Sequence, residues 1–173
     1  MPAILILSSH VAASAVGGSA QGVALARMGI ETALVPTVLL GRHPGLGAPG
    51  GGAVSDAIFE GMLEGVAATG LLGRLDAVIT GYFASPGQVA AAARIIGAVR
   101  AASPGARIVV DPIMGDYPGG LYVPETVALA IVADLIPLGV RHIVIDPFDP
   151  VPEYLDALVD LAIRDRTGRS AAD

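Results

Sequence analysis

The stretch IVVDPIMGD, residues 108–116, is the part of the sequence that decides the fold class. It opens with an uninterrupted apolar run, reaches an Asp-Pro pair at Asp111, and places a second carboxylate at Asp116. Consecutive apolar residues, in place of an alternating pattern, are typical of a strand covered on both faces of a parallel sheet. The stretch therefore predicts a buried central strand with carboxylates at its carboxyl end.

Further apolar runs of strand length lie on both sides of this one, and segments of helical periodicity separate them. The other predicted strands are residues 3–7, 32–38, 77–80 and 142–145. Ser19, Ser55 and Ser85 indicate helix starts, and two more helices are expected at residues 124–135 and 152–164. This alternation predicts a three-layer α/β/α domain with a mainly parallel sheet of about five strands.

The bulk composition fits one soluble domain. The chain has 173 residues, 53% of them hydrophobic, which is enough to bury a core. We expect residues 1–164 to form a single domain and residues 165–173 a charged tail. Charged residues, Gly or Pro interrupt every apolar run before the roughly 18 residues that a membrane-spanning helix needs. With no cysteine in the chain, these features predict a cytoplasmic protein without a membrane partner.

Charge and residue types exclude several classes of function. The net charge of −6 repels a phosphate backbone, and the ten basic residues, all of them arginine, are scattered, so nucleic acid is not an expected partner. Because the chain has no lysine, a Walker A loop and a lysine Schiff base are excluded. The three histidines, at positions 10, 43 and 142, have no metal-ligand spacing, which argues against a transition-metal site.

Polar and glycine-rich segments follow each predicted strand, where ligands bind in open α/β sheets. These segments are residues 8–10, 41–52, 81–82, 111–116 and 146–149. Residues 41–52 contain six glycines and two prolines and form either a lid or a surface insertion. Asp111 and Asp116 either hold Mg²⁺ through water at a phosphoryl-transfer site or serve as turn and surface residues.

The segments around these aspartates resemble a known family. DPIMGD, and GGLYVPE at residues 119–125, resemble the D-P-V-M-G-D and L-Y-V-P signatures of pyridoxal kinases, a branch of the ribokinase-like superfamily. Residues 8–20, 37–47 and 76–85 are similar to three further motifs of the family, in the same order and spacing. The resemblance extends over about residues 1–138.

The resemblance implies a fold, an activity and a set of site residues. The fold would be ribokinase-like, and the reaction would move the γ-phosphoryl of ATP, with Mg²⁺, to the 5′-hydroxyl of pyridoxal, pyridoxine or pyridoxamine. Ser9 would contact the polar edge of the pyridine ring, Val16 would pack on the ring, and Tyr82 would lie against the substrate. Asp111, Asp116 and Tyr122 would belong to the Mg²⁺ and nucleotide side.

The sequence also departs from the family pattern. Arg42, His43 and Pro44 stand where the family has N-H-T, so a substrate-contacting hydroxyl is replaced by a proline ring without a donor. The family's G-x-G-D segment, which carries the catalytic base, has no counterpart in these residues. The domain is therefore expected to be truncated relative to the family, with Asp146 and Asp149 at the end of the fifth strand.

These departures leave two main hypotheses for the function. The first is a pyridoxal kinase-like protein in vitamin B6 salvage, whose isolated chain is inactive unless Asp146, Asp149 or a second chain supplies the base. The second is a catalytically dead half-domain that binds a B6 vitamer or a partner subunit. An unrelated α/β small-molecule binding protein is a third reading, and a homodimer is expected because truncation exposes a sheet edge.

Overall fold

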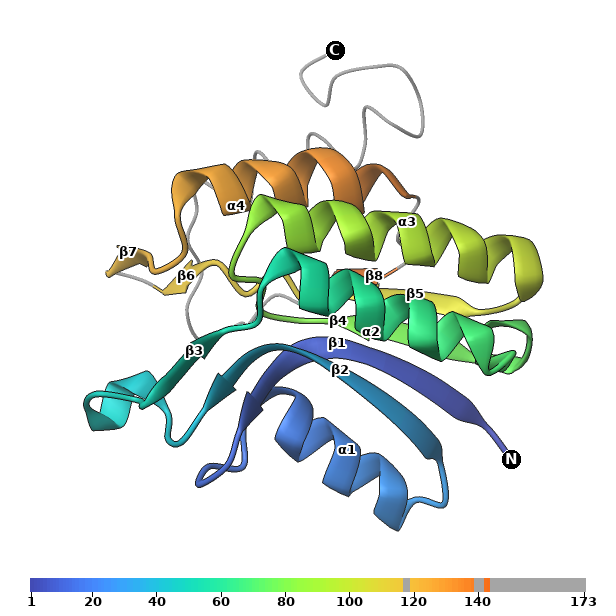
Figure 1. Ribbon diagram of the computed structural model, residues 1–173, viewed down its shortest axis with the longest axis horizontal. Helices are drawn as coiled ribbons and strands as arrows, with labels where there is room; N and C mark the ends of the chain where they lie inside the picture. The colour runs from blue at the N-terminus through green and yellow to red at the C-terminus, as the bar shows by residue number, and fades with distance from the viewer. Residues whose placement is uncertain (117–118, 139–141, 144–173) are drawn as a thin grey trace.

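The main sheet has the strand order β3-β2-β1-β4-β5-β8 in the computed structural model, which describes residues 1–116, 119–138 and 142–143 (Figure 1). Its strands are β1 Ala3–Val11, β2 Glu31–Leu40, β3 Gly51–Ala53, β4 Ala77–Thr80, β5 Arg107–Val110 and β8 His142–Ile143. All neighbours in this sheet pair in parallel except β3, which is antiparallel to β2. A separate hairpin joins β6, Gly115–Asp116, to β7, Gly120–Leu121.

Helices cover both faces of the sheet and complete three layers. They are α1 Gly17–Arg27, α2 Asp56–Ala68, α3 Pro86–Ala102 and α4 Glu125–Ala130, and α4 continues through a π-helical turn, Ile131–Leu135. Figure 1 shows α1 on one face and α2, α3 and α4 together on the other. The main core lies under these three helices, where Leu7, Val78 and Val110 of adjacent strands join Phe59 and Ile96. The predicted mainly parallel three-layer architecture is confirmed.

Two of the three predicted helix starts are confirmed. The Ser55 hydroxyl accepts a hydrogen bond from the Ile58 amide at 3.4 Å, and the Ser85 hydroxyl accepts one from the Gln88 amide at 3.1 Å. Ser19 as a helix cap was wrong, because α1 begins at Gly17, two residues earlier. The positive φ of Gly17, +55°, turns the chain into the helix directly after Val16, so Ser19 lies within the first turn.

Two strands are longer than predicted, and this changes the surroundings of two candidate segments. β1 continues to Val11, so residues 8–10 lie within the strand instead of after it. β2 continues to Leu40, where it pairs with β3. Residues 41–50 are therefore the tip of a β-hairpin, with a single 3₁₀ turn at Pro44–Leu46, and residues 51–52 belong to β3.

We call residues 38–53 the β2–β3 arm, which forms one edge of the sheet and whose tip projects beyond the other strands in Figure 1. Its base is closed by the Val54 amide, which donates to the Thr37 carbonyl at 2.9 Å. Gly51 in β3 has φ +87°, and a Cβ there would overlap the Leu39 carbonyl oxygen. Only glycine therefore fits position 51, and the strand Gly-Gly-Ala has no apolar pattern that a sequence reading could detect.

The last part of the chain is only partly described. The predicted helix at residues 124–135 is confirmed as α4 with its π-helical continuation, and β8 falls within the fifth predicted strand. Asp146, Asp149, the predicted helix at residues 152–164 and the tail at 165–173 lie outside the described residues, so the domain division stays a prediction. Among the described residues, no helix has both the length and the apolar character needed to cross a membrane.

One exposed ion pair joins the amino-terminal end of β2 to the 3₁₀ turn Leu71–Arg74. Arg74 donates two hydrogen bonds to the Glu31 carboxylate, with N–O distances of 2.5 and 2.7 Å. These bonds lower the pKa of Glu31 and raise the pKa of Arg74. Because both side chains are exposed to solvent, the pair contributes little to stability, and it lies at the opposite edge of the sheet from the candidate site.

Candidate functional site

The carboxyl ends of β1, β4 and β5 form one edge of the sheet. Leu7 pairs with Thr80, which pairs with Val110, so β4 and β5 end side by side and β1 continues beyond them to Val11. Two backbone hydrogen bonds extend this order, from the Gly81 amide to the Leu7 carbonyl at 2.9 Å and from the Asp111 amide to the Thr80 carbonyl at 3.2 Å. The predicted site residues Ser9, Tyr82 and Asp111 follow these positions and therefore share one edge.

Ser9 lies against the beginning of α1. The side chain is half-buried, and a Cβ placed on Gly17 would overlap its hydroxyl oxygen and lie 3.2 Å from its carbonyl oxygen. Val16, the N-cap residue of α1, is 36% exposed and makes no side-chain cap. The fold thus brings Ser9 and Val16 together at the junction of β1 and α1, with the Val16 side chain accessible to a ligand.

A histidine and a serine hold this junction. The Ser19 hydroxyl accepts a hydrogen bond from the Val11 amide at 2.9 Å and lies 3.2 Å from His10 Nδ1. Because the Ser19 oxygen accepts from the backbone, its own proton is available to a neutral His10 ring. Ser19 therefore fixes the end of β1 against the first turn of α1.

Tyr82 lies on the segment that follows β4, next to the buried residue Phe83. The Tyr82 side chain is half-buried, whereas the Phe83 side chain is fully buried in the main core. The Tyr82 carbonyl accepts a hydrogen bond from the Thr37 hydroxyl at 2.7 Å, which ties this segment to β2. The backbone of Tyr82 is thus held from two sides.

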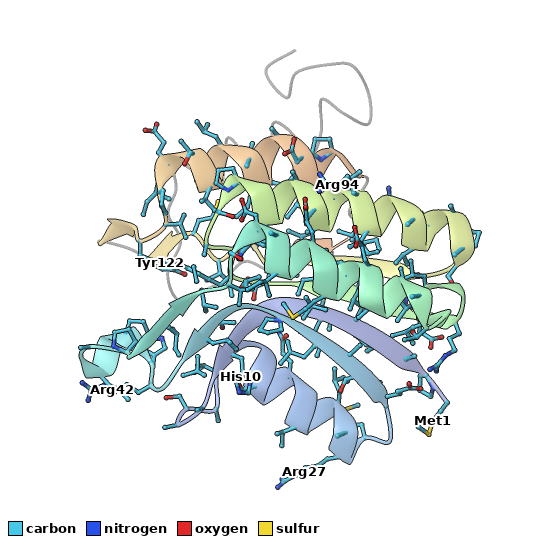
Figure 2. All side chains as sticks on the ribbon, viewed as in Figure 1. Met1, His10, Arg27, Arg42, Arg94 and Tyr122 are labelled. Carbon is cyan, nitrogen blue, oxygen red and sulfur yellow. The ribbon has the colours of Figure 1, made fainter. Side chains whose placement is uncertain are left out.

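The β2–β3 arm approaches the same region through its tip. The His43 amide lies 3.4 Å from the Ser14 hydroxyl, which belongs to the turn between β1 and α1. The Gly45 amide donates to His43 Nδ1 at 3.1 Å, so a neutral His43 ring carries its proton on Nε2. Figure 2 shows Arg42 of the arm and Tyr122 at the end of the molecule opposite Met1.

The residues predicted for the nucleotide side come from β5 and the β6–β7 hairpin. Asp111 is half-buried directly after β5, and Asp116 is the last residue of β6, with its side chain outside the described part. Tyr122 is 48% exposed after β7, and its amide donates to the Met114 carbonyl at 3.0 Å. β7 thus folds back onto the end of the 111–116 segment.

The donor types at Asp111 and Asp116 suit magnesium more than other metals. Within the described residues, no group of three or more His, Cys, Asp or Glu side chains could hold a metal ion. Magnesium, however, usually takes one or two carboxylates together with substrate phosphates and water. A carboxylate at a strand end is therefore compatible with Mg²⁺ that arrives with a nucleotide.

Sequence reasoning missed two buried polar residues behind the site, Thr37 and Gln88. Both side chains are fully buried and hydrogen-bonded to backbone atoms of other segments. A signal for Gln88 was present, because Ser85 and Gln88 have the S-x-x-Q spacing of a capping box. No local pattern indicates the partners of Thr37, since they come from a distant part of the chain.

No family model matches this chain. Pyridoxal kinase PdxY of Deinococcus radiodurans is 37% identical over 134 residues, which are 78% of this chain and 45% of that protein. The pyridoxine/pyridoxal/pyridoxamine kinase of Bordetella avium has the same identity and the same coverage of each chain. These homologues of the chain are pyridoxal kinases. The predicted resemblance to pyridoxal kinases over a partial, amino-terminal segment is thereby confirmed.

A solved structure of a pyridoxal kinase supports the same relation at the level of the fold. Pyridoxal kinase from Leishmania donovani, in complex with ADP and pyridoxamine, superposes with a TM-score of 0.72 at 29% identity. The match covers 78% of this chain and 48% of the Leishmania kinase. The ribokinase-like α/β fold is thus confirmed, and the chain spans a little under half the length of the three pyridoxal kinases named above.

Proposed function

We propose that this chain provides the vitamer-binding part of a pyridoxal kinase, which transfers the γ-phosphoryl of ATP to the 5′-hydroxyl of pyridoxal, pyridoxine or pyridoxamine. The observation that carries the proposal is the shared edge of Ser9, Val16 and Tyr82 in a chain whose homologues are pyridoxal kinases. The Leishmania donovani relative, solved with ADP and pyridoxamine, supports both the nucleotide and the vitamer as ligands.

The roles on the vitamer side follow from the chemistry of three side chains. The Ser9 hydroxyl donates to or accepts from the polar edge of the pyridine ring. Val16, accessible at the start of α1, packs on the face of the ring. The Tyr82 ring lies against the substrate from the next strand. Together these groups hold the vitamer with its 5′-hydroxyl in a fixed direction, which is the main requirement for phosphoryl transfer.

The roles on the nucleotide side belong to Asp111, Asp116 and Tyr122. The two carboxylates hold Mg²⁺ through water, and Tyr122 lies near the ATP phosphates. When bound, Mg²⁺ neutralises charge on the phosphates and aligns them for transfer. Because a loose phosphoryl-transfer transition state needs little covalent chemistry, positioning and charge neutralisation carry the reaction.

The alternative function is a half-domain that binds a B6 vitamer, or a partner subunit, without turnover. In that case a homodimer, or a second polypeptide, would complete the site. The two functions share the vitamer side, so binding and transfer must be measured separately.

Vitamer binding is the first test of the proposal. We expect isothermal titration calorimetry to detect pyridoxal binding to the purified chain, and Tyr82→Ala to weaken it about 3- to 10-fold through the loss of aromatic contact. Leu129→Ala, at a residue 61% exposed on α4, serves as the control and should bind like the wild type. Equal affinity of Tyr82→Ala and the wild type would contradict the vitamer site.

Phosphoryl transfer by the 173-residue chain is the second test. With ATP and Mg²⁺ in excess, we expect little or no pyridoxal 5′-phosphate in a coupled kinase assay, because the catalytic carboxylate of the family has no counterpart in this sequence. A turnover of roughly 1 s⁻¹ or more, as in ordinary small-molecule kinases, would show that another carboxylate serves as the base. Absence of both binding and transfer would reject the proposed function.

A further inference from the structure

Gln88 is a buried polar side chain that bonds to three separate backbone segments. It is the third residue of α3 and is fully buried. Its Oε1 accepts from the Ala84 amide at 2.9 Å, and its Nε2 donates to the Thr37 carbonyl at 2.9 Å and the Val54 carbonyl at 2.7 Å. Because one partner is a donor and two are acceptors, only one orientation of the amide satisfies all three.

The hydrogen-bond partners of Gln88 belong to two segments that border the candidate site. Ala84 ends the segment that carries Tyr82, whereas Thr37 and Val54 flank the β2–β3 arm at its closed base. The Thr37 hydroxyl adds a second tie, since it donates to the Tyr82 carbonyl at 2.7 Å. Two fully buried side chains, from β2 and α3, therefore join the base of the arm to the Tyr82 segment.

We propose that Thr37 and Gln88 form a clamp that fixes Tyr82 relative to the β2–β3 arm and thereby sets the affinity for the vitamer. The inference rests on the proposed function, because it assigns the ligand of the edge that the clamp supports. Both are positioning residues, acting through Tyr82 and the arm. The arm also contacts the turn between β1 and α1, because the Ala12 and Ala13 amides donate to the Leu40 and Gly41 carbonyls at 2.9 Å, so a shift at the base is transmitted to the start of α1.

Loss of the Gln88 amide would loosen these segments instead of unfolding the helix. The Val54 carbonyl and the Ala84 amide would each lose the bond to Gln88, and buried backbone groups without partners are relieved by local opening to water. The start of α3 keeps its own support, because the Ser85 hydroxyl caps the helix and also donates to the Asp56 carboxylate. The opening is therefore confined to the arm and the Tyr82 segment.

The test compares Gln88→Met, which keeps the length of the side chain without hydrogen bonds, with Val99→Ala. Val99 lies in the same helix, is fully buried and apolar, and is outside the clamp. Both variants should lower the urea midpoint. Measured by calorimetry under conditions where circular dichroism shows both folded, Gln88→Met should bind pyridoxal about 5- to 10-fold more weakly, and Val99→Ala should bind like the wild type.

A second readout does not depend on a ligand. Arg42 is the only trypsin site in residues 38–53, and its cleavage, followed by mass spectrometry, reports opening of the arm. We expect cleavage to be about threefold faster or more in Gln88→Met, and unchanged in Val99→Ala. If the wild-type chain binds no pyridoxal, the proposed function fails and the effect on affinity fails with it, but the cleavage rates still decide whether the clamp holds the arm.

Gln88→Glu adds a pH profile that a purely structural role would not give. An ionised carboxylate would face two carbonyl oxygens, whereas the protonated acid can donate one hydrogen bond to them. The affinity of this variant for pyridoxal, relative to the wild type at each pH, should therefore recover as the pH falls from about 8 to about 5. Wild-type affinity and wild-type cleavage in Gln88→Met would overturn the clamp, as would equal losses in Gln88→Met and Val99→Ala.

Discussion

Replacing Phe83 with alanine is expected to lower the free energy of unfolding by about 3–5 kcal/mol, the usual cost of truncating a large buried aromatic side chain. Phe83 is 0% exposed and belongs to the main core between the sheet and the helices α2, α3 and α4. The truncation removes apolar contacts and leaves a cavity that the surrounding side chains fill only in part. Urea denaturation followed by circular dichroism gives the change directly.

The matched control is Ile58→Ala, which removes a large apolar side chain that is 60% exposed on α2. Its unfolding free energy should stay within about 0.5 kcal/mol of the wild type, as is usual for surface positions. A loss below about 1 kcal/mol in Phe83→Ala would contradict the described core. The result also bears on the site, because Phe83 is the buried neighbour that anchors the Tyr82 backbone.

Gly17→Ala is expected to weaken pyridoxal binding about tenfold and to destabilise the fold by about 1–2 kcal/mol. The φ of Gly17 is +55°, a region that alanine enters only with strain. The added Cβ would also overlap the Ser9 hydroxyl oxygen, so Ser9 must move away from the position proposed for the pyridine contact. Calorimetry with pyridoxal and urea denaturation measure the two effects separately.

The control for this variant lies five residues further along the same helix. Gly22 is inside α1, its φ is not positive, and an added Cβ would meet no atom within 4 Å apart from its chain neighbours and the backbone of its own helix. Gly22→Ala should therefore stabilise the protein by about 0.5–1 kcal/mol, because alanine favours the helix, and leave pyridoxal affinity unchanged. Wild-type affinity in Gly17→Ala would show that the Ser9 hydroxyl does not contact the vitamer.

Local signals in the sequence were enough to predict the parts of the fold that lie in the core. β4 and β5 are short apolar runs buried between neighbours, and Ser55 and Ser85 are helix caps whose hydrogen bonds involve residues three positions away. Both kinds of signal depend on residues close in sequence. The shared edge of Ser9, Tyr82 and Asp111 followed from the parallel topology alone.

The parts that could not be predicted depend on contacts between distant residues or on backbone shape. β3 consists of Gly-Gly-Ala and has no apolar pattern, and its pairing with β2 is set by the approach of Gly51 to Leu39. Serine is a common N-cap residue, but α1 begins at Gly17, two residues before Ser19. Gln88 meets Thr37 across 51 residues of chain. The roles of the six predicted site residues stay predictions.

The way in which the β2–β3 arm is attached determines which part of it can change in sequence. Its tip is closed by its own hydrogen bonds, such as those from the Gly41 amide to the Pro49 carbonyl and from Arg42 Nε to the Ala48 carbonyl. The rest of the arm is held at Thr37 and Val54 and, along β2, by hydrogen bonds from the Ala12 and Ala13 amides to the Leu40 and Gly41 carbonyls. The tip, residues 42–50, therefore behaves as an interchangeable module: a sequence of different length or polarity can be grafted there while the sheet and the core stay unchanged.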